Sequence, residues 1–165
     1  MSDDRFIECD RMRFTRNTLS ANLVLLAILF DVFYFINIYK SDVGHNVGNF
    51  YYQMRIGVSI ITNLVFLLAA FLSSEGIKNY KVSYAYLLLG LGALQIVRIF
   101  ILPLQALNSE VVIGGVTYHV METAQFVRVT IYLILSALGC LSAAVIGIRK
   151  SRELNEHLAS IGQAA

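Results

Sequence analysis

The residues of this chain best suited to chemistry are polar side chains within long apolar segments. Asp31 and Arg98 are charged, and Asn63, Gln95 and Ser136 are neutral groups at comparable positions in the apolar blocks. Ionisable groups at membrane depth are costly, so they usually face one another or a wet cavity. These residue types predict either a structural ion pair or a site for a ligand or an ion.

The spacing of the polar residues indicates that they share an interior. Residues three or four apart lie on one face of a helix. At ~1.5 Å per residue, the deepest of them lie about 10 to 16 Å from the outer ends of the helices. We therefore predict a common polar network or cavity in the outer half of a helix bundle. Its members are Asp31, Tyr34, Ser59, Asn63, Gln95, Arg98, Arg128, Tyr132 and Ser136.

Two interpretations of this set remain open from the sequence. Asp31 and Arg98 could form a buried pair that holds the first helix to the third, while Arg55 and Arg128 reach lipid phosphates from the rim. Alternatively, the same residues could form a ligand or ion site. With Asp31 ionised, the three arginines would make such a site net positive.

Other chemistries have little support in the residues present. Cys9 and Cys140 are isolated, and the three histidines lie outside the apolar blocks, which argues against a thiol pair and a buried pair of haem ligands. The sequence has no Gly-rich phosphate loop and no Ser/His/Asp set at one depth. We therefore expect a non-enzymatic protein with no catalytic residues, no metal site and no cofactor.

Four membrane-spanning helices must position the polar residues. The chain has 165 residues, of which 57% are hydrophobic and 15% charged, and its mean hydropathy is +0.65. About 20 apolar residues are needed to cross ~30 Å of hydrocarbon, and four blocks are long enough. The sequence thus predicts an all-α membrane protein, a four-transmembrane-helix bundle. The expected spans are Leu19–Tyr39, Ile56–Ser74, Val82–Leu104 and Gln125–Ile148.

The distribution of Lys and Arg predicts the orientation of the spans. Basic residues concentrate in the N-terminal segment, in the second connection and in the tail, and such segments are retained in the cytoplasm. We expect residues 1–18 to form a cytoplasmic juxtamembrane segment, 19–148 the membrane domain and 149–165 a cytoplasmic tail. This arrangement (N-in/C-in) predicts an integral plasma membrane protein, with a bacterial inner membrane favoured.

The connections and the helix surfaces carry further patterns. Two β-branched runs around Gly114-Gly115 predict a short external β-hairpin between the third and fourth spans. A run of small residues at intervals of four predicts a helix-packing face on the fourth span. This face consists of Gly139, Ala143 and Gly147.

The two ends of the chain also have apolar residues among charges. Leu154, Leu158 and Ile161 share one face of the tail. This face could lie on the membrane or meet a partner, and we prefer to interpret the tail as a continuation of the fourth span. The N-terminal segment mixes apolar residues with arginines and predicts an interfacial anchor to anionic headgroups. Its apolar members are Phe6, Ile7, Met12 and Phe14.

The favoured function is that of a small subunit or accessory partner of a membrane complex, because the chain has little soluble mass and several candidate packing faces. The alternative is a small transporter or ligand-binding bundle with a polar cavity built around Asp31 and Arg98. One acidic residue midway along the first of four spans resembles the arrangement in small multidrug resistance transporters. This chain departs from that family in its greater length, its large loops and its Lys/Arg bias.

The expected partners are the lipid bilayer and either another membrane protein or a second copy of the chain. The net charge is +2, and the basic residues are not interleaved with an aromatic surface. Nucleic-acid binding is therefore not expected.

Overall fold

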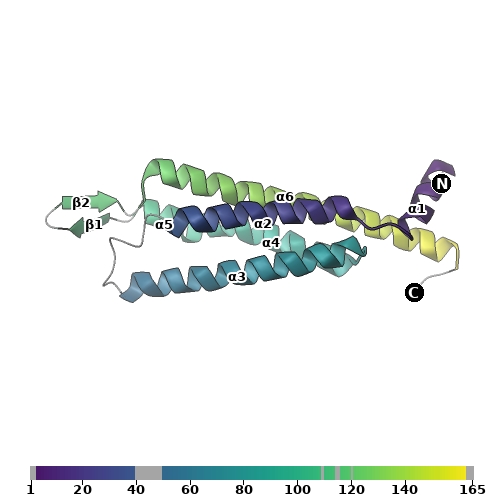
Figure 1. The fold of residues 1–165 in the computed structure, drawn as a ribbon, viewed down its shortest axis with the longest axis horizontal. Coiled ribbons are helices and arrows are strands. Elements are labelled where there is room, and N and C mark those ends of the chain that lie inside the picture. The colour runs from purple at the N-terminus through teal and green to yellow at the C-terminus, as the bar shows by residue number, and fades with distance from the viewer. Residues whose placement is uncertain (1–2, 40–49, 109, 114–115, 120, 163–165) are drawn as a thin grey trace.

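The computed structural model describes residues 3–39, 50–108, 110–113, 116–119 and 121–162. Within these ranges, four long helices lie side by side along the long axis of the molecule (Figure 1). Each is long and apolar enough to cross a membrane, which confirms the prediction of a membrane protein with four candidate spans. The helices are α2 (Thr18–Tyr39), α3 (Phe50–Lys78), α4 (Val82–Ile101) and α6 (Thr123–Ser160).

The shorter elements lie at the two ends of the bundle (Figure 1). At one end, which we name the hairpin end, α5 (Pro103–Leu107) is followed by the antiparallel strands β1 (Glu110–Ile113) and β2 (Val116–His119). At the other, which we name the terminal end, α1 (Asp3–Met12) lies beside the last turns of α6. Gly114 and Gly115, and residues 40–49 of the first connection, fall outside the described residues.

The buried residues of the long helices recur at alternating intervals of three and four. On α2 they include Ser20, Val24, Ala27, Asp31, Tyr34 and Ile38. On α6 they include Val129, Leu133, Ser136, Cys140, Ala143 and Gly147. A mean repeat of 3.5 residues keeps one stripe of each helix against its neighbours. Large apolar side chains on the remaining faces are exposed, as expected where the solvent is lipid.

Helices α2 and α4 lie between α6 and α3, and each of them packs against both (Figure 1). Close approach of α6 to its neighbours depends on small residues. A Cβ atom added to Gly139 would lie 2.9 Å from the Cβ of Ala27 on α2, and Gly147 faces Ile77 and Ala85. Ala143 is fully buried. The three small residues predicted as a packing face thus point to neighbouring helices within this chain.

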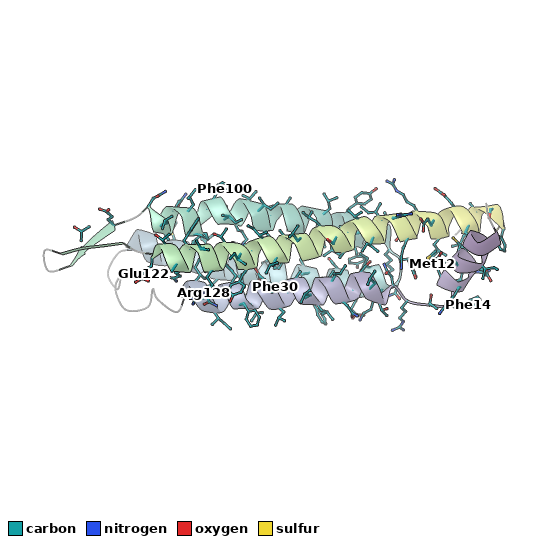
Figure 2. The ribbon with its side chains drawn as sticks, turned by 90° about the horizontal axis from the view of Figure 1, so that it is seen from above. Met12, Phe14, Phe30, Phe100, Glu122 and Arg128 are labelled. Carbon is teal, nitrogen blue, oxygen red and sulfur yellow. The ribbon has the colours of Figure 1, made fainter. Side chains whose placement is uncertain are left out.

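Helix α6 continues past Ile148 without a break, so the tail prolongs the fourth span as far as Ser160. Helix α1 packs on this extension, where Cys9 and Met12 form an apolar cluster with Leu154. The expected headgroup contact is therefore wrong for Met12, because its side chain is buried against α6. Figure 2 labels Met12 and Phe14 at this end of the molecule. The apolar residues of this segment that remain exposed are Phe6, Ile7 and Phe14.

Candidate functional site

A layer of buried polar side chains crosses the bundle between two apolar clusters. Each long helix contributes at least one residue to this layer. Its members are Asp31, Asn63, Gln95, Arg98 and Ser136. The cluster on the terminal side is built around Phe66, Leu88 and Ala144, and the cluster on the hairpin side includes Ile38 and Leu133. The layer is therefore held away from both ends of the helices.

Hydrogen bonds connect all four long helices through this layer. The Arg98 Nη1 donates to Asp31 Oδ1 at 2.8 Å and to Gln95 Oε1 at 2.6 Å, while Nη2 donates to Asn63 Oδ1. The Gln95 Nε2 donates to Asp31 Oδ1 at 2.8 Å and to Ser136 Oγ at 2.9 Å. Residues 95 and 98 are three apart on α4, so both reach the same interior.

The charges in this layer form a closely matched pair. The side chains of Arg98 and Asp31 are 6% and 0% exposed. The guanidinium carbon of Arg98 also lies 4.7 Å from the centroid of the Tyr34 ring, a cation–π distance. Removing two charges from water is expensive, and only the mutual attraction together with these hydrogen bonds can offset that cost. The arrangement ties α2 to α4 through one neutral ion pair.

Two polar atoms of the layer have no hydrogen-bond partner among the described residues. They are Asp31 Oδ2 and Asn63 Nδ2, an acceptor and a donor. Buried polar atoms are normally paired with protein or water. The layer therefore keeps one free acceptor, Asp31 Oδ2, and one free donor, Asn63 Nδ2, for a further hydrogen-bond partner.

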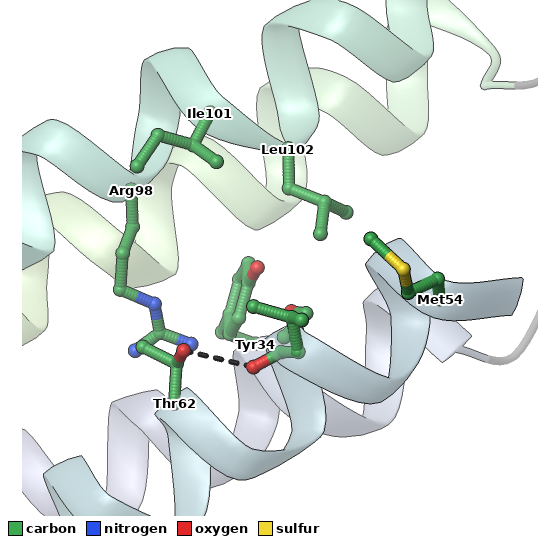
Figure 3. Close-up of a pocket in the computed structure, with 8 residues that line it drawn as sticks. Tyr34, Met54, Thr62, Arg98, Ile101 and Leu102 are labelled. Atoms are coloured by element: carbon green, nitrogen blue, oxygen red, sulfur yellow. Dashed lines mark hydrogen bonds between the residues drawn. The ribbon is translucent and has the colours of Figure 1, made fainter. Parts of the chain in front are cut away.

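A cavity of about 320 Å³ lies beside this layer, between α2, α3 and α4. Figure 3 shows Arg98 extending from α4 towards Thr62 on α3, and Leu102 opposite Met54. The Thr62 hydroxyl donates to the carbonyl of Val58 at 2.8 Å, so its oxygen can still accept a bond. The wall is otherwise mainly apolar. Further lining residues are Tyr34, Val58, Ser59 and Ile101.

The structure brings together seven of the nine residues predicted for the polar site. Five form the layer, Tyr34 packs on Arg98, and Ser59 lines the cavity. The other two lie elsewhere. Tyr132 packs against the apolar cluster of the hairpin side, with its ring 5.8 Å from that of Phe33. Arg128 is exposed.

The expectation for Arg128 and Tyr132 is wrong because strict intervals of four drift around a helix. Four residues turn about 400°, so each step moves a side chain by about 40°. The buried residues of α6 instead follow one another at alternating intervals of four and three residues. Val129 and Leu133 therefore face the interior, in the places predicted for Arg128 and Tyr132. With Arg128 exposed and the Arg55 side chain outside the described part, the described layer is neutral rather than net positive.

Sequence reasoning missed most of the cavity wall. Thr62 could have been predicted to share the polar face, because it follows Ser59 by three residues on the same helix. The sequence could not identify the apolar lining residues, since an apolar side chain on a spanning helix has the same polarity whether it faces lipid or a cavity. These residues are Met54, Val58, Ile101 and Leu102. Among the described residues, no group of three or more His, Cys, Asp or Glu could hold a metal ion.

The chain was also compared with family models, with curated proteins and with solved structures, and none of the three comparisons gave a match. Four apolar helices long enough to span a membrane, with a charged layer buried among them, define the chain as a membrane protein.

Proposed function

We propose that this chain is a non-enzymatic membrane protein that binds a lipophilic small molecule in the cavity beside Arg98. The observation that carries the proposal is a mainly apolar cavity with a buried guanidinium at its edge. Ligand sites are usually clefts of at least ~300 Å³ with apolar walls and a few placed polar groups. This cavity meets that description near its lower size limit. Transport of the ligand is a further step that the same site would serve.

Charge balance favours a neutral ligand with a hydrogen-bond acceptor. A guanidinium has five N–H donors, and Arg98 uses three of them on Asp31, Gln95 and Asn63. The other two have no partner among the described residues and can meet a carbonyl or hydroxyl oxygen. Asp31 already balances Arg98, so an anionic ligand would add an uncompensated charge in a medium of low dielectric.

A matched set of ligands and variants tests this proposal. The ligands are a long-chain methyl ketone, the alkane and the fatty acid of equal chain length, and the measurement is thermal unfolding of the protein in detergent. A bound ligand raises stability in proportion to the logarithm of its concentration over Kd. We expect the ketone to raise the unfolding temperature more than either of the others.

Two substitutions on α3 compare the wall of the cavity with the lipid-facing surface of the same helix. Val58 lines the cavity, whereas Ile61 does not, and both side chains are exposed. Val58→Phe should abolish the stabilisation by the ketone, and Ile61→Phe should preserve it. Equal effects of the two substitutions, or equal stabilisation by all three ligands, would remove the support for a site in this cavity.

A second candidate is a small subunit or accessory partner of a membrane complex. It is supported by the length of α6, whose 38 residues span about 57 Å against ~30 Å of hydrocarbon. The excess, with α1 packed on it, offers a surface outside the bilayer. Extraction from native membranes in mild detergent should then recover a stoichiometric partner. Recovery of the chain as a solitary monomer would contradict this role.

We also propose that both termini lie in the cytoplasm of a bacterial plasma membrane, with the hairpin end outside. The support is the concentration of Lys and Arg in the N-terminal segment, the turn between α3 and α4, and the end of α6.

A further inference from the structure

Helix α3 packs on the bundle along only part of its length. Its buried side chains recur from Asn63 to Ile77, towards the terminal end. On the hairpin side of Asn63, the described side chains of α3 are those of Met54 and of residues 57–62, and none of them is buried. Figure 1 shows α3 diverging from α2 towards the hairpin end. We name residues 50–62 of α3 the arm.

The two apolar clusters of the bundle divide α3 at the same point. The cluster of the terminal side contains Phe66, Ala70 and Ile77 of this helix. The cluster of the hairpin side has no described member from α3. In lipid, helices are not driven together by the hydrophobic effect, and their association depends on close packing and interhelical hydrogen bonds. The arm therefore has less packing to hold it than the rest of α3.

Hydrogen bonds fix the other half of α3 to the bundle. Near its C-terminal end, the hydroxyl of Ser74 donates to a backbone carbonyl of α2 at 3.4 Å. The N–H of Asn17 donates to the carbonyl of Lys78 at 3.0 Å. At the polar layer, Asn63 accepts from Arg98. Among the described residues, this is the last side-chain hydrogen bond from α3 to another helix in the direction of the hairpin end, so the arm begins where the fixed part of α3 ends.

The helix has a point of bending beside the polar layer. The hydroxyl of Thr62 donates to the carbonyl of Val58, four residues earlier, at 2.8 Å. A bond of this kind competes with the backbone hydrogen bond of the same carbonyl, and it often bends helices. Because Thr62 directly precedes Asn63, a bend at this point would move the arm and leave the rest of α3 in place.

The arm forms one side of the cavity beside Arg98. Tyr34 and Arg98, at the floor of this cavity, are buried. At its rim, Met54 and Val58 of the arm and Ile101 of α4 are each more than half exposed (Figure 3). Exposed apolar side chains of a spanning helix meet hydrocarbon. The cavity therefore opens sideways between α3 and α4, and the position of the arm sets the width of the opening.

We propose that the arm is a lateral gate, which swings about the polar layer and opens the cavity to the bilayer between α3 and α4. A lipophilic molecule would then enter from the hydrocarbon without passing through water. The admission of a ligand rests on the proposed function, whereas the movement of the arm does not. Met54 lies nine residues from Asn63, so at ~1.5 Å per residue a bend of about 20° would displace it by about 5 Å.

Distances between paired spin labels, measured by pulsed electron paramagnetic resonance in proteoliposomes, test this movement. The two native cysteines are replaced first. The labelled pairs are Met54→Cys with Ile131→Cys and Leu72→Cys with Val145→Cys. Met54 and Leu72 both lie nine residues from Asn63, and all four positions are exposed. Without ligand, we expect the distance distribution of the first pair to be wider by about 5 Å than that of the second.

Two outcomes would overturn the gate. Equal narrow widths would show that the arm is fixed, and equal broad widths would show that α3 moves as a whole. The ketone is tested separately, by thermal unfolding of the unlabelled protein. If the arm moves but the ketone does not stabilise the protein, the proposed function fails and the movement stands. If the ketone stabilises the protein but the two widths are equal, the gate fails and the ligand site stands.

Substitutions beside the polar layer test the position of the hinge. Asn63→Ala removes the tie to α4 and should widen the distribution measured from Met54. Thr62→Val keeps the shape of the side chain but removes the hydroxyl that bends the helix, and should narrow the distribution. Ser73→Ala is the matched control, because its hydroxyl donates to the backbone of its own helix at 2.6 Å in the fixed half. An equal change in this control, or no change in the other two variants, would overturn a hinge at the polar layer.

Discussion

Arg98 belongs both to the polar layer and to the wall of the cavity beside it. Its guanidinium donates to residues of α2, α3 and α4 and packs on the Tyr34 ring. A ligand in the cavity would therefore contact a group whose position is already set by Asp31 and Asn63. Preorganisation of this kind lowers the entropic cost of binding, because few side chains need to be ordered when the ligand arrives.

At the scale of single residues, the ion pair makes a prediction about stability. Asp31→Asn leaves the buried charge of Arg98 without its counterion, which costs about 3 to 5 kcal/mol in proteins generally. Hydrogen bonds within bilayers are often weaker, at about 0.6 to 1.7 kcal/mol each. We therefore expect Asp31→Asn to lower the free energy of unfolding by about 3 kcal/mol, the lower end of the range for buried ion pairs. The unfolding temperature in detergent should fall accordingly.

The double substitution Asp31→Asn with Arg98→Gln should recover much of that loss, because it removes both charges from the layer. Ser142→Ala, at an exposed position of α6 outside the layer, serves as the control and should have little effect. Strict additivity of the two single losses would show that the residues do not stabilise one another.

The polar layer was the part of the site most accessible from the sequence. Carboxyl and amide groups deep in an apolar span are costly unless they face the interior, so residue type and depth together predicted the burial of Asp31, Asn63 and Gln95. Which neighbour each would contact follows from the three-dimensional packing. The cavity could not be predicted, because residues such as Ile101 and Leu102 have the same polarity as the lipid-facing surface.

At the scale of the helices, apolar length predicted the spans well and their ends less well. The apolar stretch of the fourth span ends at its first charge, Arg149, but the helix α6 continues to Ser160. Packing on α1 supports those last turns, through Leu154 and the buried side chain of His157 beside Phe6. That contact joins residues far apart in the chain, and local sequence patterns do not contain it.

The contact between α2 and α6 makes a prediction about glycine. A Cβ at position 139 would lie 2.9 Å from the Cβ of Ala27 and 3.1 Å from the carbonyl oxygen of Leu23, so Gly139→Ala must push the helices apart. Overpacking of this kind costs about 1 to 3 kcal/mol. Thermal unfolding in detergent should report the loss.

Gly90→Ala is the matched control for this substitution. Position 90 also lies within a spanning helix, yet a Cβ there meets nothing within 4 Å. Alanine is the better helix former by about 1 kcal/mol, so this variant should be as stable as the parent or more so. A Gly139→Ala protein as stable as Gly90→Ala would contradict the close approach of α2 and α6.

At the scale of the whole molecule, the proposed orientation can be measured by labelling. Asn108 lies at the hairpin end and Asn79 in the turn between α3 and α4, and both are exposed. After Cys9 and Cys140 are replaced, Asn108→Cys should react in intact cells with a thiol reagent that cannot cross the membrane. Asn79→Cys should react only after the membrane is opened. The reverse pattern would invert the proposed orientation.

The polar layer also has a consequence for how the protein is made. Asp31 and Arg98 are 67 positions apart, so at 5 to 20 residues per second Asp31 leaves the ribosome about 3 to 13 s before its partner. During that interval the first span would carry an unpaired acid into lipid. We therefore expect the nascent helix to remain beside the insertion machinery, or to keep Asp31 near the aqueous boundary, until α4 brings in Gln95 and Arg98. We thus expect the helices of this chain to be held at the insertion machinery and released to the bilayer together, rather than one at a time.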